Sequence, residues 1–154
     1  MEPDLFRGRG AGEIAHLARY GAPVSLLLFD IDLFKAINDT HGHLVGDWIL
    51  IELARLIGCH LREVDVMARW GGKEFAILMP HCGASEAVHA AEKLRVLVAD
   101  QAFHEVGAVT VSIGVAEFQP RESDNAWVKR ADDSLYAAKA GGRNRVCLSG
   151  REIR

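Results

Sequence analysis

The chain has 154 residues, of which 49% are hydrophobic and 25% charged, values that suit a single globular domain with a hydrophobic core. Its formal net charge of −3 excludes the global basic field with which proteins bind nucleic acid polymers. No apolar run is long enough to span a membrane, and the polar, glycine-rich residues 1–12 lack the apolar core of a signal peptide. We therefore expect a cytoplasmic domain, or the cytoplasmic domain of a larger protein, that does not contact a membrane through this segment.

Apolar patterns with helix and strand periods interleave along the chain. The continuous apolar run at residues 24–29 is typical of a buried central strand. We expect helices over residues 13–19, 47–61, 84–99 and 123–140, a helical turn over 33–37, and further strands over 108–118 and 145–148. Ser85 is the expected N-cap of the helix over 84–99, and Gly114 marks either a bulge or a close approach of the backbone within its strand.

Gly71 and Gly72 mark a tight turn between two short apolar runs, residues 64–68 and 75–79. A Gly-Gly turn flanked by strand patterns predicts a β-hairpin. A hairpin among interleaved strands and helices predicts an α/β (α+β) fold, in which a mixed central sheet is flanked by helices, and argues against a doubly wound parallel sheet.

Asp30 and Asp32 place two carboxylates at the C-terminal end of the predicted central strand. A carboxylate in this position is well placed to hold magnesium next to phosphates. It serves equally well to cap a helix or to fix a turn, and the two residues alone do not decide between these roles.

The polar segment 38–46 is expected to be a loop, with Asn38 at its start and Asp47 directly after it. An Asn side chain supplies both a donor and an acceptor, and a carboxylate accepts from guanine N1–H and N2–H, so the two residues could read a guanine base. The alternative, which the local pattern favours, is that Asp47 only caps the helix that follows.

Two further groups of charged residues have an ordinary and a functional interpretation. Lys139 and Arg143, at the end of the last predicted helix, could grip a triphosphate or could be surface charges that offset the helix dipole. Arg62 and Asp65, just before the hairpin, could contact phosphates and bases or could form a surface ion pair that contributes little. Considered singly, none of these residues identifies a function.

The hairpin turn itself carries an unexpected residue. Acidic residues directly after such a turn, close to an aspartate on a neighbouring strand, would suit a divalent metal ion. Here the first residue after the glycines is Lys73, which cannot ligate magnesium and places its own positive charge where the metal would be. Glu74 follows, but adjacent residues of a strand point to opposite faces, so we do not expect it to replace the missing carboxylate.

The order and spacing of these residues are more specific than any one of them. The segments concerned are residues 30–39 (DIDLFKAIND), 42–43 (GH), 46–47 (GD), 69–75 (RWGGKEF), 111–115 (VSIGV), 131–132 (AD), 135–139 (LYAAK) and 142–145 (GRNR). Through them the chain, from about Pro23 to Val146, resembles the GGDEF family of diguanylate cyclases. The resemblance assigns residues 23–150 to a GGDEF domain and leaves residues 1–22 as an atypical N-terminal segment with a short helix.

In that family two GTP-loaded domains meet face to face and make cyclic di-GMP and pyrophosphate, on a fold similar to polymerase palms and class III nucleotide cyclases. The resemblance implies that Asp30 and the carbonyl of Ile31 hold magnesium, and that Asn38 and Asp47 read guanine. It implies phosphate contacts from Lys35, Lys139 and Arg143, and a close approach of the backbone to the nucleotide at Gly71 and Gly72. It also implies an RxxD inhibitory site for the product at Arg62 and Asp65, to which Arg69 contributes.

Two departures from the family pattern bear on activity. The family has Asp or Glu where this chain has Lys73, and that carboxylate bridges the metals needed for the 3′-hydroxyl to attack the α-phosphate. Charge reversal should abolish two-metal chemistry and makes a magnesium cofactor doubtful; Lys73 would instead pair with Asp30 or touch the phosphates. The family's DxLTGLxNR segment before the first helix survives only as fragments, Asp4-Leu5 and Arg7.

The sequence therefore favours a degenerate GGDEF domain that does not make cyclic di-GMP but binds it at Arg62 and Asp65, as a receptor or regulatory module. One alternative is a weak or partner-dependent cyclase, working as a homodimer or as a heterodimer with an intact GGDEF domain. Another is a domain that senses GTP or only binds a protein partner.

Overall fold

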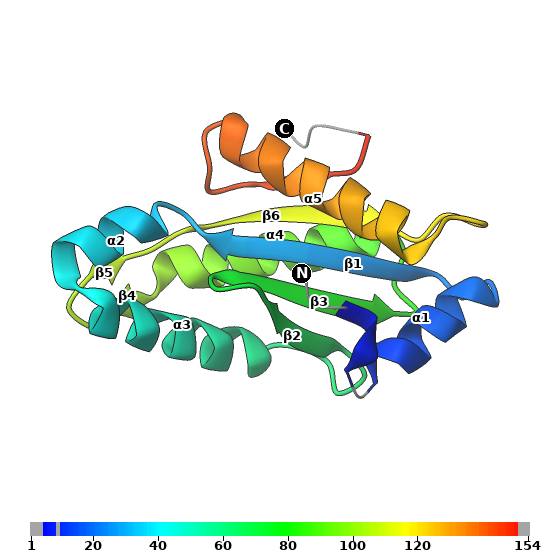
Figure 1. The fold of residues 1–154 in the computed structure, drawn as a ribbon, viewed down its shortest axis with the longest axis horizontal. Helices are drawn as coiled ribbons and strands as arrows, with labels where there is room; N and C mark the ends of the chain where they lie inside the picture. The colour runs from blue at the N-terminus through cyan, green and yellow to red at the C-terminus, as the bar shows by residue number, and fades with distance from the viewer. Residues whose placement is uncertain (1–4, 9, 151–154) are drawn as a thin grey trace.

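The computed structural model describes residues 5–8 and 10–150, so Asp4 lies outside the described residues. The main strands are β1 (Val24–Ile31), β2 (Val66–Trp70), β3 (Glu74–Pro80), β6 (Val111–Glu117) and β7 (Val146–Leu148). They form one sheet in the order β2–β3–β1–β6–β7 (Figure 1). Only β7 runs parallel to its neighbour β6, and the other described pairs of this sheet are antiparallel. The predicted mixed sheet, with β2 and β3 as its hairpin, is therefore confirmed.

Helices cover both faces of this sheet. They are a 3-10 helix η1 (Leu5–Arg7) and the α-helices α1 (Ala11–Arg19), α2 (Phe34–His41), α3 (His43–Gly58), α4 (Ala84–Asp100) and α5 (Asp124–Ala140). α3 and α4 lie on one face, and α1 and α5 on the other (Figure 1). Two apolar clusters result, with Leu27 and Phe29 in the cluster on the α3 and α4 side and Leu26 and Leu28 in the cluster on the α5 side.

β1 is buried along its whole length, as its continuous apolar run predicts. Asp30 follows Leu28 by two residues, and alternate strand residues share a face, so its carboxylate lies on the α5 side of the sheet. Asp30 is 0% exposed. Burying a charged carboxylate costs free energy unless a partner compensates the charge, so we expect Asp30 to have such a partner.

Gly114 marks a close approach of two backbones, which is one of its two predicted roles. The pairing of β6 with β1 runs from Ser25 opposite Glu117 to Ile31 opposite Val111 without a skipped residue, so there is no bulge. A Cβ atom on Gly114 would lie 2.3 Å from the carbonyl oxygen of Ala131 in α5. Glycine is required here because α5 packs directly onto the strand.

The region expected to be a loop, residues 38–46, is largely helical, and this prediction is wrong. α2 continues to His41, Gly42 alone makes the break with φ +89, and α3 begins at His43. Asp47 therefore lies inside α3 and is not its N-cap. The polar composition was misleading because α2 is a short surface helix that buries only Phe34.

Helix ends elsewhere follow the predictions in part. The helix predicted over residues 123–140 begins one residue later, and Ser123 is the N-cap of α5, with its Oγ accepting a hydrogen bond from Ala126 N at 3.1 Å. Ser85 does not cap α4, because Glu117 reaches from β6 and its carboxylate accepts from Ala84 N at 2.5 Å. The strand predicted to begin at residue 108 begins at Val111, and the residues before it form a two-stranded sheet of β4 (Ala102–Phe103) and β5 (Gly107–Ala108) that was not predicted.

Within residues 5–8 and 10–150, no helix is both long and apolar enough to cross a membrane.

Candidate functional site

Asp30 and Glu74 lie side by side on adjacent strands. The antiparallel register of β1 and β3 pairs them directly, and directly opposite residues of such a pair point to the same face of the sheet. Lys73 precedes β3 and is exposed in the turn. The expectation that Glu74 points away from the site is therefore wrong, because strand alternation starts only after the turn. Of the two residues, Glu74 is the one paired with Asp30.

Asp30 forms an ion pair with Lys139 from the last turn of α5. Lys139 Nζ donates to Asp30 Oδ2, and the Lys139 side chain is 32% exposed. Asp30 Oδ1 is buried and has no hydrogen-bond partner among the described residues. Burial raises the pKa of Asp30, while the hydrogen bond from Lys139 and the charges of Lys139 and Lys73 oppose that rise. One oxygen is held by a cation, and the other is buried without a partner among the described residues.

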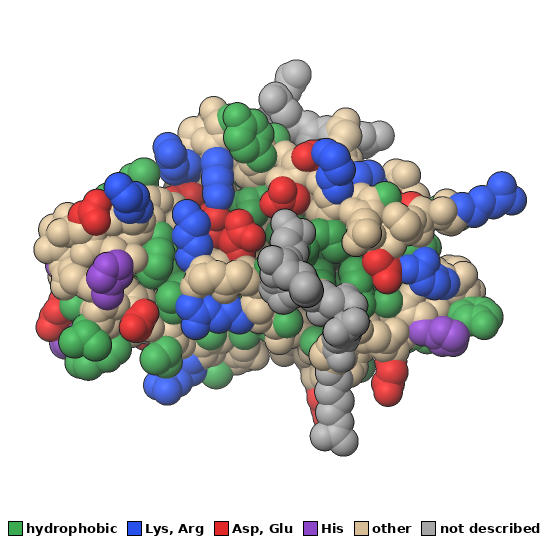
Figure 2. All heavy atoms as spheres, in the orientation of Figure 1, with side chains coloured by type: hydrophobic (Ala, Val, Ile, Leu, Met, Phe, Trp, Pro, Cys, Tyr) green, Lys and Arg blue, Asp and Glu red, His purple; other side chains and the backbone are tan. Residues whose placement is uncertain are grey.

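Glu74 is half-buried in the same acidic surroundings. Burial raises the pKa of Glu74, and the negative charges of Asp30 and Asp132 raise it further, while Lys139 and Lys73 act in the opposite direction. Figure 2 shows acidic side chains gathered near the turn between β2 and β3, with Lys and Arg side chains beside them. The fold thus gathers carboxylates and ammonium groups from β1, β3, the turn and α5.

Asp32 fixes the structure and does not offer a free ligand atom. Its Oδ1 accepts from the hydroxyl of Ser112 at 2.6 Å, and its Oδ2 accepts from the hydroxyl of Thr110 at 2.6 Å and from the N–H of Asn144 at 2.9 Å. These bonds tie the end of β1 to β6 and to the loop after α5. Of the two roles that the sequence left open, the geometry gives Asp32 the structural one.

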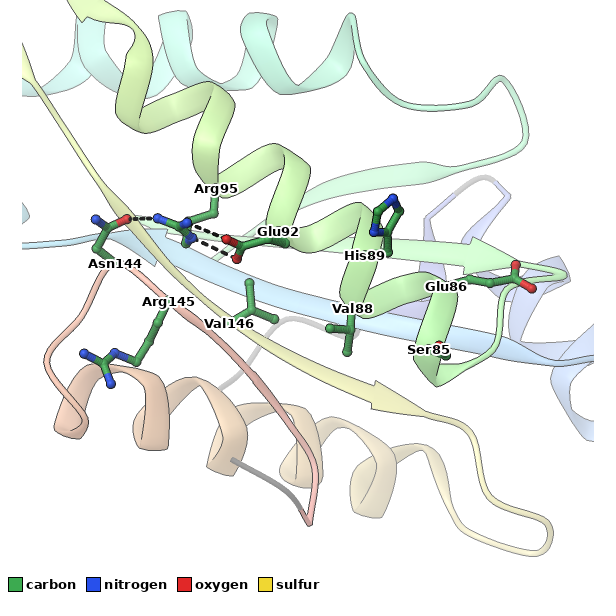
Figure 3. Close-up of a pocket in the computed structure, with 9 residues that line it drawn as sticks. All are labelled: Ser85, Glu86, Val88, His89, Glu92, Arg95, Asn144, Arg145 and Val146. Atoms are coloured by element: carbon green, nitrogen blue, oxygen red, sulfur yellow. Dashed lines mark hydrogen bonds and ion pairs between the residues drawn. The ribbon is translucent and has the colours of Figure 1, made fainter. Parts of the chain in front are cut away.

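The loop that carries Arg143 is held from two sides. Arg143 and Asn144 have φ values of +65° and +46°, a left-handed conformation that residues other than glycine rarely adopt. Asn144 donates to Asp32, and its Oδ1 accepts from Arg95 Nη1 at 2.8 Å (Figure 3). Arg95 is itself paired with Glu92 in α4, at the wall of an open hollow of about 780 Å³. Sequence reasoning missed Arg95 because its partner is distant in the chain.

The guanine candidates come together where α2 meets α3. Asn38 Oδ1 is buried without a partner among the described residues, and a Cβ atom added to Gly46 would lie only 1.8 Å from it. Asp47 is exposed next to this contact. Lys35 is exposed in the first turn of α2, with its Nζ 3.8 Å from Asp39. Asn38 therefore packs against Gly46, the residue before the exposed Asp47, and Gly46 provides the space for the Asn38 side chain.

Arg62 and Asp65 form a rigid pair at the edge of another hollow. Arg62 Nη2 donates to Asp65 Oδ1 at 2.7 Å and to the carbonyl of Pro80 at 2.8 Å, and the Arg62 N–H donates to Asp65 Oδ2 at 2.8 Å. The hydrogen bond to Asp65 raises the pKa of Arg62. The Asp65 side chain is 2% exposed, but that of Arg62 is 48% exposed, so the guanidinium remains accessible.

The hollow beside this pair has a volume of about 370 Å³ and is closed on its other side by α4. His89 and Lys93 of α4, one helical turn apart, line it together with Arg62 and Asp65. The i, i+4 spacing was a usable signal that the sequence analysis did not apply. Arg69 is not among the lining residues. It donates instead to the carbonyl of Gly72 and so stabilises the turn of residues 71–73 between β2 and β3, which we call the signature turn.

Comparison with known proteins decides the family. The family model described as "Diguanylate cyclase, GGDEF domain" matches residues 5–145. The chain belongs to the GGDEF family. The domain is 46% identical over 135 residues to the diguanylate cyclase DgcM of Escherichia coli. The matched region covers 88% of this chain and 33% of DgcM. It therefore spans about a third of the length of that relative.

Two solved GGDEF structures are close to this one. The GGDEF domain of DgcB from Caulobacter crescentus, in complex with c-di-GMP, has a TM-score of 0.85 and 38% identity over 90% of this chain and 85% of that chain. The active GGEEF domain of a diguanylate cyclase from Vibrio cholerae has a TM-score of 0.83 and 34% identity over 91% of both chains. The five letters that describe the second domain contain Glu where this GGDEF domain has Lys73.

The donor set of this GGDEF domain does not fit a two-magnesium centre. Asp30 Oδ1 and the facing carboxylate of Glu74 are suitable hard ligands, but Lys139 already holds Asp30 Oδ2, and Lys73 adds a second positive charge. Among the described residues, no group of three or more His, Cys, Asp or Glu side chains is arranged to hold a metal.

Proposed function

We propose that this GGDEF domain is a receptor for cyclic di-GMP that does not synthesise it. The observation that carries the proposal is the preformed Arg62–Asp65 pair beside its own hollow, in a chain whose signature turn carries Lys73. The support from relatives is that the similar DgcB domain was solved in complex with c-di-GMP. A site already organised around one fixed arginine loses little entropy on binding.

The free edge of Arg62 suits a phosphate or the oxygen face of a guanine. Its bonds to Asp65 and Pro80 use Nε and Nη2, so among the described residues the two N–H groups of Nη1 remain for a ligand. Lys93 adds a second positive charge to the same hollow, and cyclic di-GMP carries two phosphates. We therefore expect Arg62 and Lys93 to contact the ligand and Asp65 to orient Arg62.

Calorimetric titration with cyclic di-GMP tests the receptor proposal. We expect micromolar or tighter binding by the wild-type domain, weakened about tenfold or more by Arg62→Ala and by Lys93→Ala. Lys93→Ala is needed because Arg62→Ala leaves the buried Asp65 without its partner and can disturb the fold. Arg55→Ala, which removes an exposed arginine of α3, is the matched control and should bind as the wild type does. No binding by the wild type, or equal binding by all variants, would contradict the proposal.

A second candidate is a weak or partner-dependent cyclase, possible because Glu74 keeps a carboxylate opposite Asp30. In this case the domain would work with another GGDEF domain and would supply guanine and phosphate contacts through Asn38, Lys139 and Arg143. A mixture with an active cyclase distinguishes the two proposals. Initial rates of pyrophosphate release, taken before product accumulates, separate them: a receptor leaves turnover per active domain unchanged, whereas a partner subunit raises it.

A further inference from the structure

We propose that the nucleotide site of this domain binds GTP without a divalent cation, with the ammonium groups of Lys73 and Lys139 in place of magnesium. The inference rests on the assignment of residues 30–47 and 139–143 to a guanine nucleotide site. It does not depend on cyclic di-GMP binding at Arg62, which lies elsewhere in the fold. It goes beyond the receptor proposal because it assigns Lys73 a function in binding GTP, in addition to the loss of a metal ligand.

The charge balance of the site supports this inference. Replacing a carboxylate by Lys73 changes the local charge by two positive units, which equals the charge of one magnesium ion. The charges of both ammonium groups, Lys73 and Lys139, act on both carboxylates, Asp30 and Glu74, while Asp132 adds a third negative charge near Glu74. The protein thus carries within its own side chains the charge that a metal would otherwise supply.

The positions of the two lysines allow them to exchange partners. Lys139 is anchored at the end of α5 and reaches Asp30, but a third of its side chain is exposed, at 32%. Lys73 is exposed in the tight turn between β2 and β3, where Gly71 has φ +79. A phosphate chain that arrives at the surface can therefore be met by both ammonium groups without entering the buried core.

The backbone beside Asp30 offers additional donors to a phosphate. α2 begins at Phe34, and its N-cap residue, Leu33, has φ +58 and no side-chain hydrogen bond to the helix. The first N–H groups of a helix have no intrahelical acceptor and attract phosphate oxygens. A left-handed leucine is strained, and such strain often occurs at binding sites. These N–H groups act without a metal.

The positive charges of Lys139 and Lys73 oppose the binding of magnesium at this site. At Asp30 Oδ2 magnesium would have to displace Lys139, and at the unpaired Oδ1 it would still be opposed by the positive charges of Lys139 and Lys73. Repulsion between a divalent cation and two ammonium groups in a partly buried site is strong. We therefore expect added magnesium to leave GTP affinity unchanged or to weaken it.

Titration of the domain with GTP, in EDTA and in excess magnesium, tests the inference. We expect wild-type dissociation constants that agree within about threefold in the two conditions. Lys73→Glu restores the carboxylate of the signature, so its GTP affinity should fall about tenfold or more in EDTA and recover when magnesium is added. Arg55→Glu makes the same change in net charge on an exposed surface of α3 and should behave as the wild type does.

Two results would overturn the inference: a wild-type affinity that falls about tenfold or more in EDTA, or no GTP binding in either condition. Titration of the same preparation with cyclic di-GMP keeps the two proposals apart. Loss of GTP binding with retained cyclic di-GMP binding contradicts only the metal-free site, and the reverse pattern contradicts only the receptor.

Discussion

Three carboxylates, Asp30, Glu74 and Asp132, crowd the α5 side of the sheet near the signature turn. Asp30 has Lys139 as a partner, but Glu74 has only the more distant charges of Lys139 and Lys73 to offset its burial. Groups whose pKa is raised by burial and like charges cluster at functional sites. We infer that Glu74 is a candidate site residue.

The variant Glu74→Gln measures this cost. Because the folded-state pKa of Glu74 is raised, the charged form is unfavourable in the native state at neutral pH, and removing the charge should stabilise the fold. We expect the melting temperature to rise by about 2–4 °C, or roughly 1 kcal/mol. As the pH falls toward the ordinary glutamate pKa of 4.5, Glu74 takes up a proton and the difference should disappear.

Thermal unfolding as a function of pH checks this expectation. Glu63→Gln, at an exposed glutamate outside the site, is the control and should not reproduce the gain. If Glu74→Gln lowers the melting temperature at neutral pH, Glu74 has a stabilising partner and the charge crowding has been misread.

At the scale of elements, the proposed guanine contact depends on how α2 packs against α3, where Asn38 lies against Gly46. Glycine inside a helix is usually replaced by alanine with a gain in stability of about 0.5–1 kcal/mol. Gly46 is an exception in function, because a Cβ atom there would displace the end of the Asn38 side chain. The Asn38 amide is a flexible end that can move, and the Phe34 ring, 3.3 Å from the added Cβ, need give by only a few tenths of an ångström, so we expect the change to act mainly on Asn38.

We therefore expect Gly46→Ala to keep or raise the melting temperature but to weaken GTP binding about tenfold, with a smaller preference for GTP over ATP. Titration with both nucleotides and a thermal melt are sufficient. Gly58→Ala, on the same helix, is the matched control, because its nearest contact would be Met67 Cε at an ordinary 3.7 Å. Unchanged GTP affinity in Gly46→Ala would rule out Asn38 as a guanine contact.

Element prediction from the sequence succeeded where the signal was local and strong. The apolar run of β1, the glycines of the turn and the helical stretches that became α4 and α5 are all patterns within a few residues. It failed for α2, whose short polar surface helix has no such pattern, and at Ser85, because the group that caps α4 comes from β6. Register was also beyond reach, and register decides that Glu74 faces Asp30.

The candidate site was predictable to the same extent. The spacing typical of the family singled out Asp30, Asn38, Lys139 and the Arg62–Asp65 pair. In the structure each of them has either an ion-pair partner or a buried oxygen without a hydrogen-bond partner among the described residues. The contacts of Arg95 with Asn144, and of Asp32 with β6, join residues that are far apart in the chain. No local pattern announces such contacts.

On the scale of the whole molecule, the carboxylates Asp30 and Glu74 of the nucleotide site and the hollow of Arg62 lie on opposite faces of one sheet. Asp30 lies on the α5 side, whereas the hollow of Arg62 is lined by Met79, Cys82 and Leu94, which belong to the core on the α3 and α4 side. Residues this far apart with no shared partner usually act independently. A change in the signature can therefore remove catalysis and leave the binding of cyclic di-GMP intact.

The most direct test of this separation is a turnover assay with the purified domain, GTP and magnesium, in which cyclic di-GMP and pyrophosphate are quantified by chromatography. The active GGEEF domain from Vibrio cholerae serves as the positive control. We expect turnover at least about a thousandfold below that control, because Lys73 has replaced a carboxylate of the metal centre. Turnover within about a hundredfold of the control would contradict the view that this domain binds the messenger without making it.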